Sequence, residues 1–243
     1  CARVSAGCMN CYAERVAARF NAPGQPYAGL TTRTSQGPKW TGEVRTYPDL
    51  LTEPLRWTTP RRIFVNSMSD LFHDDVDDPF ILQVFDIMRQ SANGFSRRVG
   101  KSGRGGGTGR AVATHTFQIL TKRPKRMLDF CQRLRMLPDG KSGLLLAHTP
   151  DYPGLNPLPL MRNVWLGVSV EDQATADSRI PLLLQTPAAV RWISAEPLLG
   201  PIQLLDPPNH FTLPRQGWLE RADQNAPRID WVVAGGESGP GAR

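Results

Sequence analysis

Three of the four cysteines in this 243-residue chain lie within its first eleven positions, as Cys1, Cys8 and Cys11. Their spacing is C-x6-C-x2-C, and residues 10–20 that follow have the apolar spacing of an amphipathic helix. Thiolates are soft ligands that hold zinc or iron–sulfur clusters. A structural zinc site takes four ligands, and no histidine accompanies these three cysteines. The pattern therefore indicates a metal centre with one open coordination position, or, alternatively, three reduced cysteines that pack near a helix start.

The rest of the chain predicts a parallel β/α scaffold for these cysteines. Five short apolar runs read as strands that are buried on both faces, and helices are predicted at 79–90, from 124 to about 136, and through 184. The strands are predicted at 62–66, 115–120, 163–168, 190–194 and 230–234. Alternating strands and helices predict an α/β fold with right-handed crossovers. We expect a partial (βα)6 TIM-like barrel, truncated at both ends, with its sixth strand before Cys1.

Polar residues recur where the predicted strands end. In parallel β/α folds, chemistry gathers at the carboxyl ends of the strands. A single polar residue there is as well explained by a solvated loop or a helix cap. The recurrence at successive strand ends favours a shared site, and the residues at these positions are Asp70, Lys122, Ser169, Glu196 and Glu237.

The segments between these elements are irregular. Residues 21–42, 139–159 and 207–227 are predicted to be loops, and residues 47–57 a helix that is interrupted at Pro54. Residues 92–114 are predicted to be a flexible insertion within a single domain of residues 1–243, because they are rich in Gly, Ser and Arg. This insertion has five basic residues and no acidic one: Arg97, Arg98, Lys101, Arg104 and Arg110.

Composition narrows the class of protein. The chain has 29 Lys and Arg against 22 Asp and Glu, a net charge of +7, which favours a polyanionic partner. No apolar run approaches the ~20 residues that cross a bilayer, and no secretory signal is present. Clustered cysteines fit a reducing compartment. We therefore expect a cytoplasmic protein that is not associated with a membrane.

Six segments of the chain together resemble a phage-associated family of radical-SAM-like proteins that is labelled a domain of unknown function. They occur in order over nearly the whole chain, outside the basic insertion and the looser loops. The segments are GCMNCYAERVA, RIFVNSMSDLFHDDV, HTFQILTKRP, NVWLGVSVEDQ, RWISAEPLLGP and DWVVAGGESGPGAR.

The resemblance implies a barrel of the radical-SAM type in which Cys1, Cys8 and Cys11 bind a [4Fe–4S] cluster. The fourth iron would bind S-adenosylmethionine. An electron donor would reduce the cluster, and the cluster would pass the electron to S-adenosylmethionine and cleave it. The products would be methionine and a 5′-deoxyadenosyl radical, which abstracts hydrogen from the substrate.

The resemblance also implies the residues that surround this cofactor. Tyr12 would pack beside the cluster. The candidates for contacts with S-adenosylmethionine or the substrate are Asn66, Ser67, Ser69, Asp70, Ser169, Glu196 and Glu237. Cys131 lies in an apolar helix and is expected in the core.

The chain departs from the common radical-SAM pattern in two places. Six residues rather than three separate Cys1 from Cys8, and the strand after the cysteine loop ends in NSMSD rather than Gly-Gly-Glu. Gly235-Gly236-Glu237 has that sequence, but it follows the last strand, so the role of binding the methionine amino group is not transferred to it.

Three classes of function follow. The first is a radical-SAM-type enzyme that acts on a nucleic acid or nucleotide, and the second is a metal- or cluster-stabilised nucleic-acid-binding protein without catalysis. The third is a barrel hydrolase that uses Asp70, His73, a glutamate and a divalent metal. It ranks last, because the sequence has no linear signature for it. No pattern in the sequence designates a catalytic residue or a particular substrate.

Overall fold

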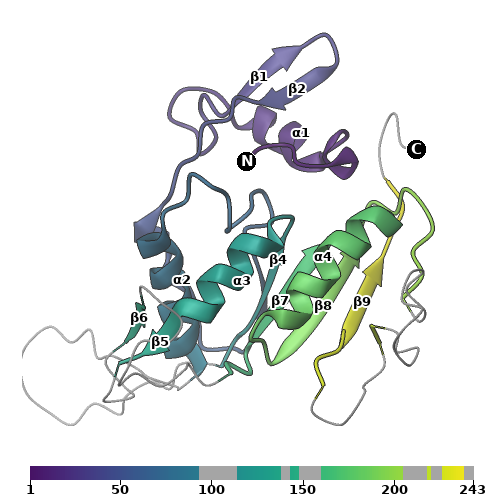
Figure 1. Cartoon of the computed structure of the whole chain (residues 1–243). Helices are drawn as coiled ribbons and strands as arrows, with labels where there is room; N and C mark the ends of the chain where they lie inside the picture. The colour runs from purple at the N-terminus through teal and green to yellow at the C-terminus, as the bar shows by residue number, and fades with distance from the viewer. Residues whose placement is uncertain (93–113, 138–142, 148–159, 205–217, 220–225, 238–243) are drawn as a thin grey trace, which may run out of the picture.

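A five-stranded parallel sheet forms the centre of the protein (Figure 1). The computed structural model describes residues 1–92, 114–137, 143–147, 160–204, 218–219 and 226–237. The strands are adjacent in the order β3-β4-β7-β8-β9. They span Arg62–Val65 (β3), Thr116–Thr121 (β4), Val164–Ser169 (β7), Val190–Ala195 (β8) and Trp231–Ala234 (β9).

The α/β class and the parallel strands predicted from the sequence are confirmed, but the partial (βα)6 barrel is wrong. In the described residues β3 and β9 are the two ends of the strand order, and each has a single neighbouring strand. The chain before Arg62 forms a helix, a small hairpin and 3-10 turns, none of which pairs with β3. With five strands in an open order, the sheet is not a six-stranded barrel.

Three helices lie against one face of the sheet: α2 (Asp78–Ala92), α3 (Pro124–Arg133) and α4 (Gln173–Gln185) (Figure 1). Alternate strand residues point to this face. Ile119, Val168 and Ile193 belong to the core here and are completely buried. Apolar burial between helices and sheet is therefore what fixes the positions of the strand ends.

Three tryptophans pack together on the sheet, one from each of β7, β8 and β9. The rings of Trp192 and Trp231 have centroids 5.1 Å apart, and those of Trp165 and Trp231 are 5.8 Å apart. Gly167 is the register partner of Trp192. A Cβ at Gly167 would lie 2.6 Å from the Trp192 ring, so only glycine leaves room for the indole.

The cysteine-bearing segment lies beyond the carboxyl ends of the strands, next to a small hairpin (Figure 1). It comprises η1 (Ala6–Cys8) and α1 (Tyr12–Arg19), and the hairpin pairs β1 (Thr31–Thr34) with β2 (Gly37–Trp40). The prediction of a loop over 21–42 missed this hairpin. Thr-rich β1 has the β-branched composition of a strand, and Gly37 takes the positive φ of +101° that follows the tight turn.

Two further predictions are corrected. Residues 47–57 form two 3-10 turns, η2 (Pro48–Leu50) and η3 (Glu53–Arg56), because the prolines supply no backbone donor for a continuous helix. Helix α3 ends at Arg133, and β5 (Leu134–Met136) then pairs with β6 (Leu144–Leu146) within the predicted loop.

The predicted insertion at 92–114 lies outside the described residues except for its two ends, as does most of 207–227. In the part of the chain that the structure describes, no helix has the length and apolar character needed to cross a membrane.

Candidate functional site

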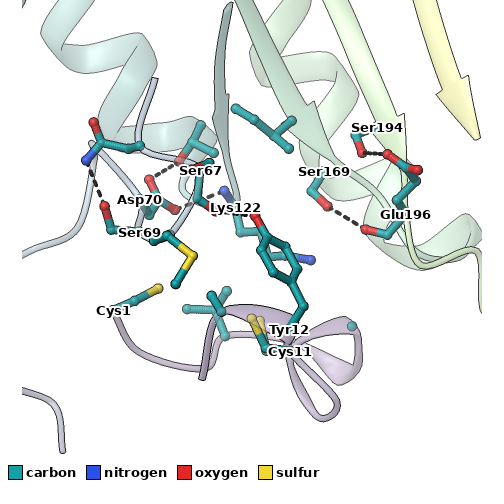
Figure 2. A pocket seen from close by; sticks show the side chains of 18 of the residues that line it. Cys1, Cys11, Tyr12, Ser67, Ser69, Asp70, Lys122, Ser169, Ser194 and Glu196 are labelled. Atoms are coloured by element: carbon teal, nitrogen blue, oxygen red, sulfur yellow. Dashed lines mark hydrogen bonds between the residues drawn. The ribbon is translucent and has the colours of Figure 1, made fainter. Parts of the chain in front are cut away.

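A cavity of about 400 Å³ lies between the cysteine segment and the carboxyl ends of the strands. Figure 2 shows side chains from both sides facing it. Twelve residues singled out from the sequence line it together: Cys1, Cys8, Cys11, Tyr12, Asn66, Ser67, Ser69, Asp70, Lys122, Ser169, Glu196 and Glu237. Its size is within the range of small-molecule sites.

The three cysteines of the segment are half-buried free thiols. Cys8 ends η1, and Cys11 is the residue before α1. Burial raises the pKa of Cys11. Burial acts in the same direction on Cys8, but backbone hydrogen bonds from Val4 and Ser5 and the charge of Lys122 outweigh it, so the pKa of Cys8 is lowered.

The donor set fits an iron–sulfur cluster in its chemistry, since three thiols line the same cavity. They do not yet form a preassembled centre. Among the described residues, no three His, Cys, Asp or Glu side chains are grouped closely enough to hold a metal ion. Binding a cluster therefore requires the segment of residues 1–11 to draw the thiols together.

The turn after β3 presents hydroxyl groups to the cavity. Asn66 adopts a φ of +58°, a conformation that asparagine tolerates better than most residues. Its side-chain amide donates to Ser69 Oγ at 2.8 Å, and its carbonyl accepts from the Ser69 amide at 2.9 Å. Ser67 contributes its backbone carbonyl to the Tyr12 hydroxyl, which joins α1 to this turn.

Asp70 is a buried organiser of the strand ends. One carboxylate oxygen accepts hydrogen bonds from the Phe72 amide and the Thr121 hydroxyl, and the other from the Lys122 amide and the Arg123 guanidinium. The four donor–acceptor distances are 2.7–3.1 Å. Protein donors already use both oxygens, so Asp70 shapes the cavity through its neighbours.

The remaining strand ends present carboxylates. Ser194 donates to Glu196 Oε2 at 3.0 Å, and the Ser169 hydroxyl donates to the Glu196 carbonyl at 3.3 Å. The Asn10 amide donates to Glu237 Oε2 at 3.0 Å, which joins the cysteine segment to the end of β9. A Cβ at Gly235 would lie 2.6 Å from Glu196 Oε1, so the Glu196 carboxylate packs closely against the backbone after β9.

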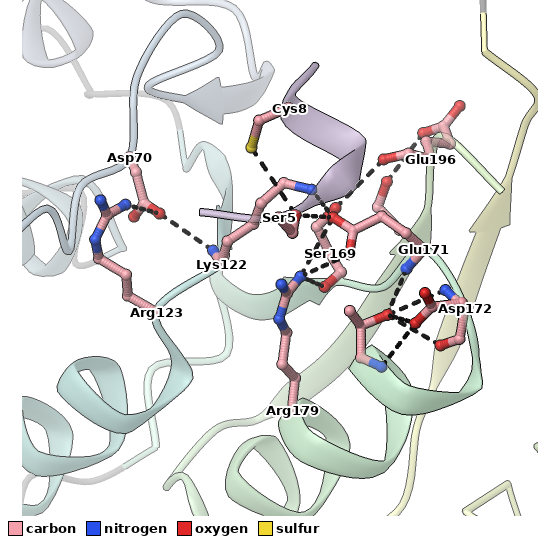
Figure 3. Close-up of polar contacts among 12 residues, drawn as sticks. Ser5, Cys8, Asp70, Lys122, Arg123, Ser169, Glu171, Asp172, Arg179 and Glu196 are labelled. Carbon is pink, nitrogen blue, oxygen red and sulfur yellow. Dashed lines mark hydrogen bonds and ion pairs between the residues drawn. The ribbon is translucent and has the colours of Figure 1, made fainter. Parts of the chain in front are cut away.

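A buried charged cluster beside Cys8 was not recognised as a site in the sequence (Figure 3). At its centre is Glu171, whose carboxylate accepts from Ser5, Lys122 and Arg179. Burial lowers the pKa of Lys122 to about 8. Lys122 and Glu171 each follow a predicted strand, and this position was the one feature of the sequence that could have indicated the cluster. Arg179 is one of several polar residues in α4, and nothing in the sequence distinguishes it.

His73 and Asp70 do not form the centre expected for a metal hydrolase. His73 is buried, and its Nδ1 accepts a hydrogen bond from the Asp75 amide. Its pKa is lowered by burial and by the charge of Arg123. Because protein donors also use both oxygens of Asp70, the described residues favour the cysteine-lined cavity over a hydrolase site.

One protein family matches the chain, over residues 1–95 and 108–243, and its description is "Protein of unknown function (DUF5131)". The match leaves out residues 96–107, which lie within the predicted insertion. No curated protein and no solved structure matches the chain.

Proposed function

The chain belongs to DUF5131, a family of proteins of unknown function, and we propose that it is an iron–sulfur enzyme of the radical S-adenosylmethionine type. The observation that supports this proposal is the shared cavity. Three cysteines from one end of the chain and polar residues from the carboxyl ends of all five strands of the parallel sheet line it. The resemblance of six sequence segments to radical-SAM-like proteins supports it independently.

Cys1, Cys8 and Cys11 would hold the cluster. A [4Fe–4S] cluster bound by three thiolates keeps one iron for another ligand and supplies the electron that cleaves S-adenosylmethionine. Thiolate is the form of cysteine that binds metal, and the lowered pKa of Cys8 favours this form.

The opposite wall suits a small polar ligand with a cationic end. Glu196 and Glu237 offer carboxylates that can accept hydrogen bonds from an ammonium or from sugar hydroxyls. Ser67 and Ser69 offer hydroxyls from the turn after β3. Apolar neighbours in the same cavity, including Phe64, keep water from part of its surface.

The substrate class in this proposal is a nucleic acid or a nucleotide. The net charge of +7 attracts polyanions over long range. An electron donor for the cluster is the further partner that the chemistry requires.

The test is anaerobic reconstitution with iron and sulfide, followed by EPR of the reduced protein with and without S-adenosylmethionine. We expect a [4Fe–4S] signal that changes when S-adenosylmethionine is added. Cys8→Ala and Cys11→Ala should lose the signal. Cys131→Ala is the matched control and should keep it, because Cys131 is buried in α3, away from the cavity lining.

Two outcomes would contradict the proposal. The first is a wild-type protein that takes up no cluster and instead retains zinc, which would favour a metal-stabilised binding protein. The second is a cluster signal that survives in both Cys8→Ala and Cys11→Ala, since these residues would then not be ligands.

A further inference from the structure

Glu171 lies almost completely buried at the point where the cysteine segment meets the sheet, with 1% of its surface exposed. It lies two residues after the end of β7 and directly before Asp172, the N-cap of α4. Its amide donates to Thr175 Oγ1 at 2.8 Å, and its carbonyl accepts from the Leu199 amide at 2.8 Å. The backbone of Glu171 is therefore fixed by α4 and by the loop after β8.

The carboxylate of Glu171 is also fixed, by two cations: Lys122, which follows β4, and Arg179, which lies in α4. Lys122 Nζ donates to Oε1, and Arg179 Nη1 lies 3.1 Å from Oε2. Arg179 donates from the same nitrogen to the Ser169 carbonyl at 2.7 Å. A buried carboxylate that is paired on both oxygens keeps one geometry, because any rotation would leave a buried charge without a partner.

The cysteine segment contacts this fixed carboxylate in two ways. Ser5 Oγ donates to Oε1 at 2.8 Å. Gly7 lies against the side chain, so that a Cβ there would be 2.5 Å from Glu171 Cγ and 2.8 Å from Oε1. Gly7 immediately precedes Cys8, and Ser5 lies three residues before it, with Ser5 Oγ 3.9 Å from Cys8 Sγ.

We propose that Glu171 is a positioning residue that holds the cysteine segment against the sheet through its contacts with Ser5 and Gly7. Lys122 and Arg179 keep the Glu171 carboxylate in place for these contacts. The role of Glu171 is to hold Cys8 at the cavity. This inference rests on the proposed function only for the identity of what the cysteines bind. The contact between Glu171 and the cysteine segment is present in the metal-free protein.

The experiment measures how fast iodoacetamide alkylates each cysteine in the reduced, metal-free protein, with peptide mapping by mass spectrometry. The variants are Ser5→Ala and Gly7→Ala. Gly236→Ala is the matched control, because a Cβ at Gly236 meets nothing within 4 Å although this glycine also lines the cavity. Buried Cys131 reports in every sample whether the whole protein has unfolded.

We expect Ser5→Ala and Gly7→Ala to alkylate at Cys8 about tenfold faster than the wild type, since a hydrogen bond to a charged group corresponds to about that factor. Gly236→Ala should match the wild type, and Cys131 should stay protected.

A variant at Glu171 itself tests the direct contact. Glu171→Asp shortens the side chain and withdraws its carboxylate from Ser5, so Cys8 should alkylate faster in this variant while Cys131 stays protected. The inference is overturned if Cys8 alkylates at the wild-type rate in Ser5→Ala and in Gly7→Ala while Cys131 remains protected. If Gly7→Ala exposes Cys131, Ser5→Ala decides alone, because it removes only a hydroxyl.

Iron uptake separates this inference from the proposed function. Ser5→Ala and Gly7→Ala should take up less iron on reconstitution than Gly236→Ala. A wild type that binds no iron would contradict the proposed function, whereas the alkylation rates would still decide whether Glu171 positions the loop.

Discussion

Asp70→Asn is the substitution that most directly tests how the cavity is built. The carboxylate of Asp70 is 7% exposed and accepts four hydrogen bonds, two at each oxygen. Asparagine keeps the shape of the side chain but replaces one oxygen with an NH2 group, which faces two donors. It also removes the negative charge beside Arg123.

The expected loss of stability can be worked out from these contacts. A hydrogen bond to a charged group contributes about 1.5–3 kcal/mol, and removing one partner of a buried ion pair costs about 3–5 kcal/mol. Thr121 can reverse its hydroxyl and accept from the new amide, which recovers part of this. We expect a net destabilisation of about 3 kcal/mol, or about 6–12 °C in Tm for a chain of this size.

The assay is urea unfolding followed by circular dichroism, with Asp74→Asn as the control. Asp74 also pairs with Arg123, at 3.7 Å, but its side chain is 79% exposed. Exposed pairs contribute about 0–1 kcal/mol. The reasoning would be refuted if the free energy of unfolding of Asp70→Asn lay within about 1 kcal/mol of the wild-type value, or if Asp74→Asn lost as much stability as Asp70→Asn. Asp70 would then be free to serve a ligand instead of the protein.

Two further predictions concern packing and ionisation. Gly167→Ala should destabilise the protein by about 1–3 kcal/mol in urea unfolding, because its Cβ would overlap the Trp192 ring, whereas Gly236→Ala should have almost no effect. In the metal-free protein, the alkylation rate of Cys8 should reach its midpoint at lower pH than that of Cys11, because the thiolate reacts and the pKa of Cys8 is lowered while that of Cys11 is raised. Equal midpoints would contradict the charge arrangement at the cavity.

The sequence predicted the bounds of the five strands of the parallel sheet to within one residue, because each is a short apolar run that ends in polar residues. Their parallel pairing brings the polar ends together, which is why Ser169 and Glu196, 27 positions apart, are in contact. The prediction of a barrel was wrong because it depended on the order of the strands in the sheet. Strand patterns identify strands one by one, but they do not say whether the strand order closes.

The charged cluster around Glu171 is the part of the site that the sequence could not provide. Glu171 reads as an ordinary loop residue, and Arg179 as one of several polar residues on a helix. Their contact depends on the rotation of α4 about its axis, which is set by the packing of residues such as Ile180 in the core. A buried ion pair of this kind leaves no pattern of its own, because its members are distant in sequence.

The contacts described between the cysteine segment and the sheet differ in kind from those within the sheet layer. Ser5, Asn10 and Tyr12 hydrogen-bond to residues after three different strands, whereas α2, α3 and α4 bury apolar side chains against the sheet. Separating surfaces that are joined by such hydrogen bonds costs less free energy than opening an apolar core, since water can replace the hydrogen bonds. We therefore expect the sheet and its helices to fold first and the cysteine segment to dock on them afterwards. If a cluster binds as proposed, this order would separate its insertion from folding, so that a cell could keep a store of folded protein without its cofactor.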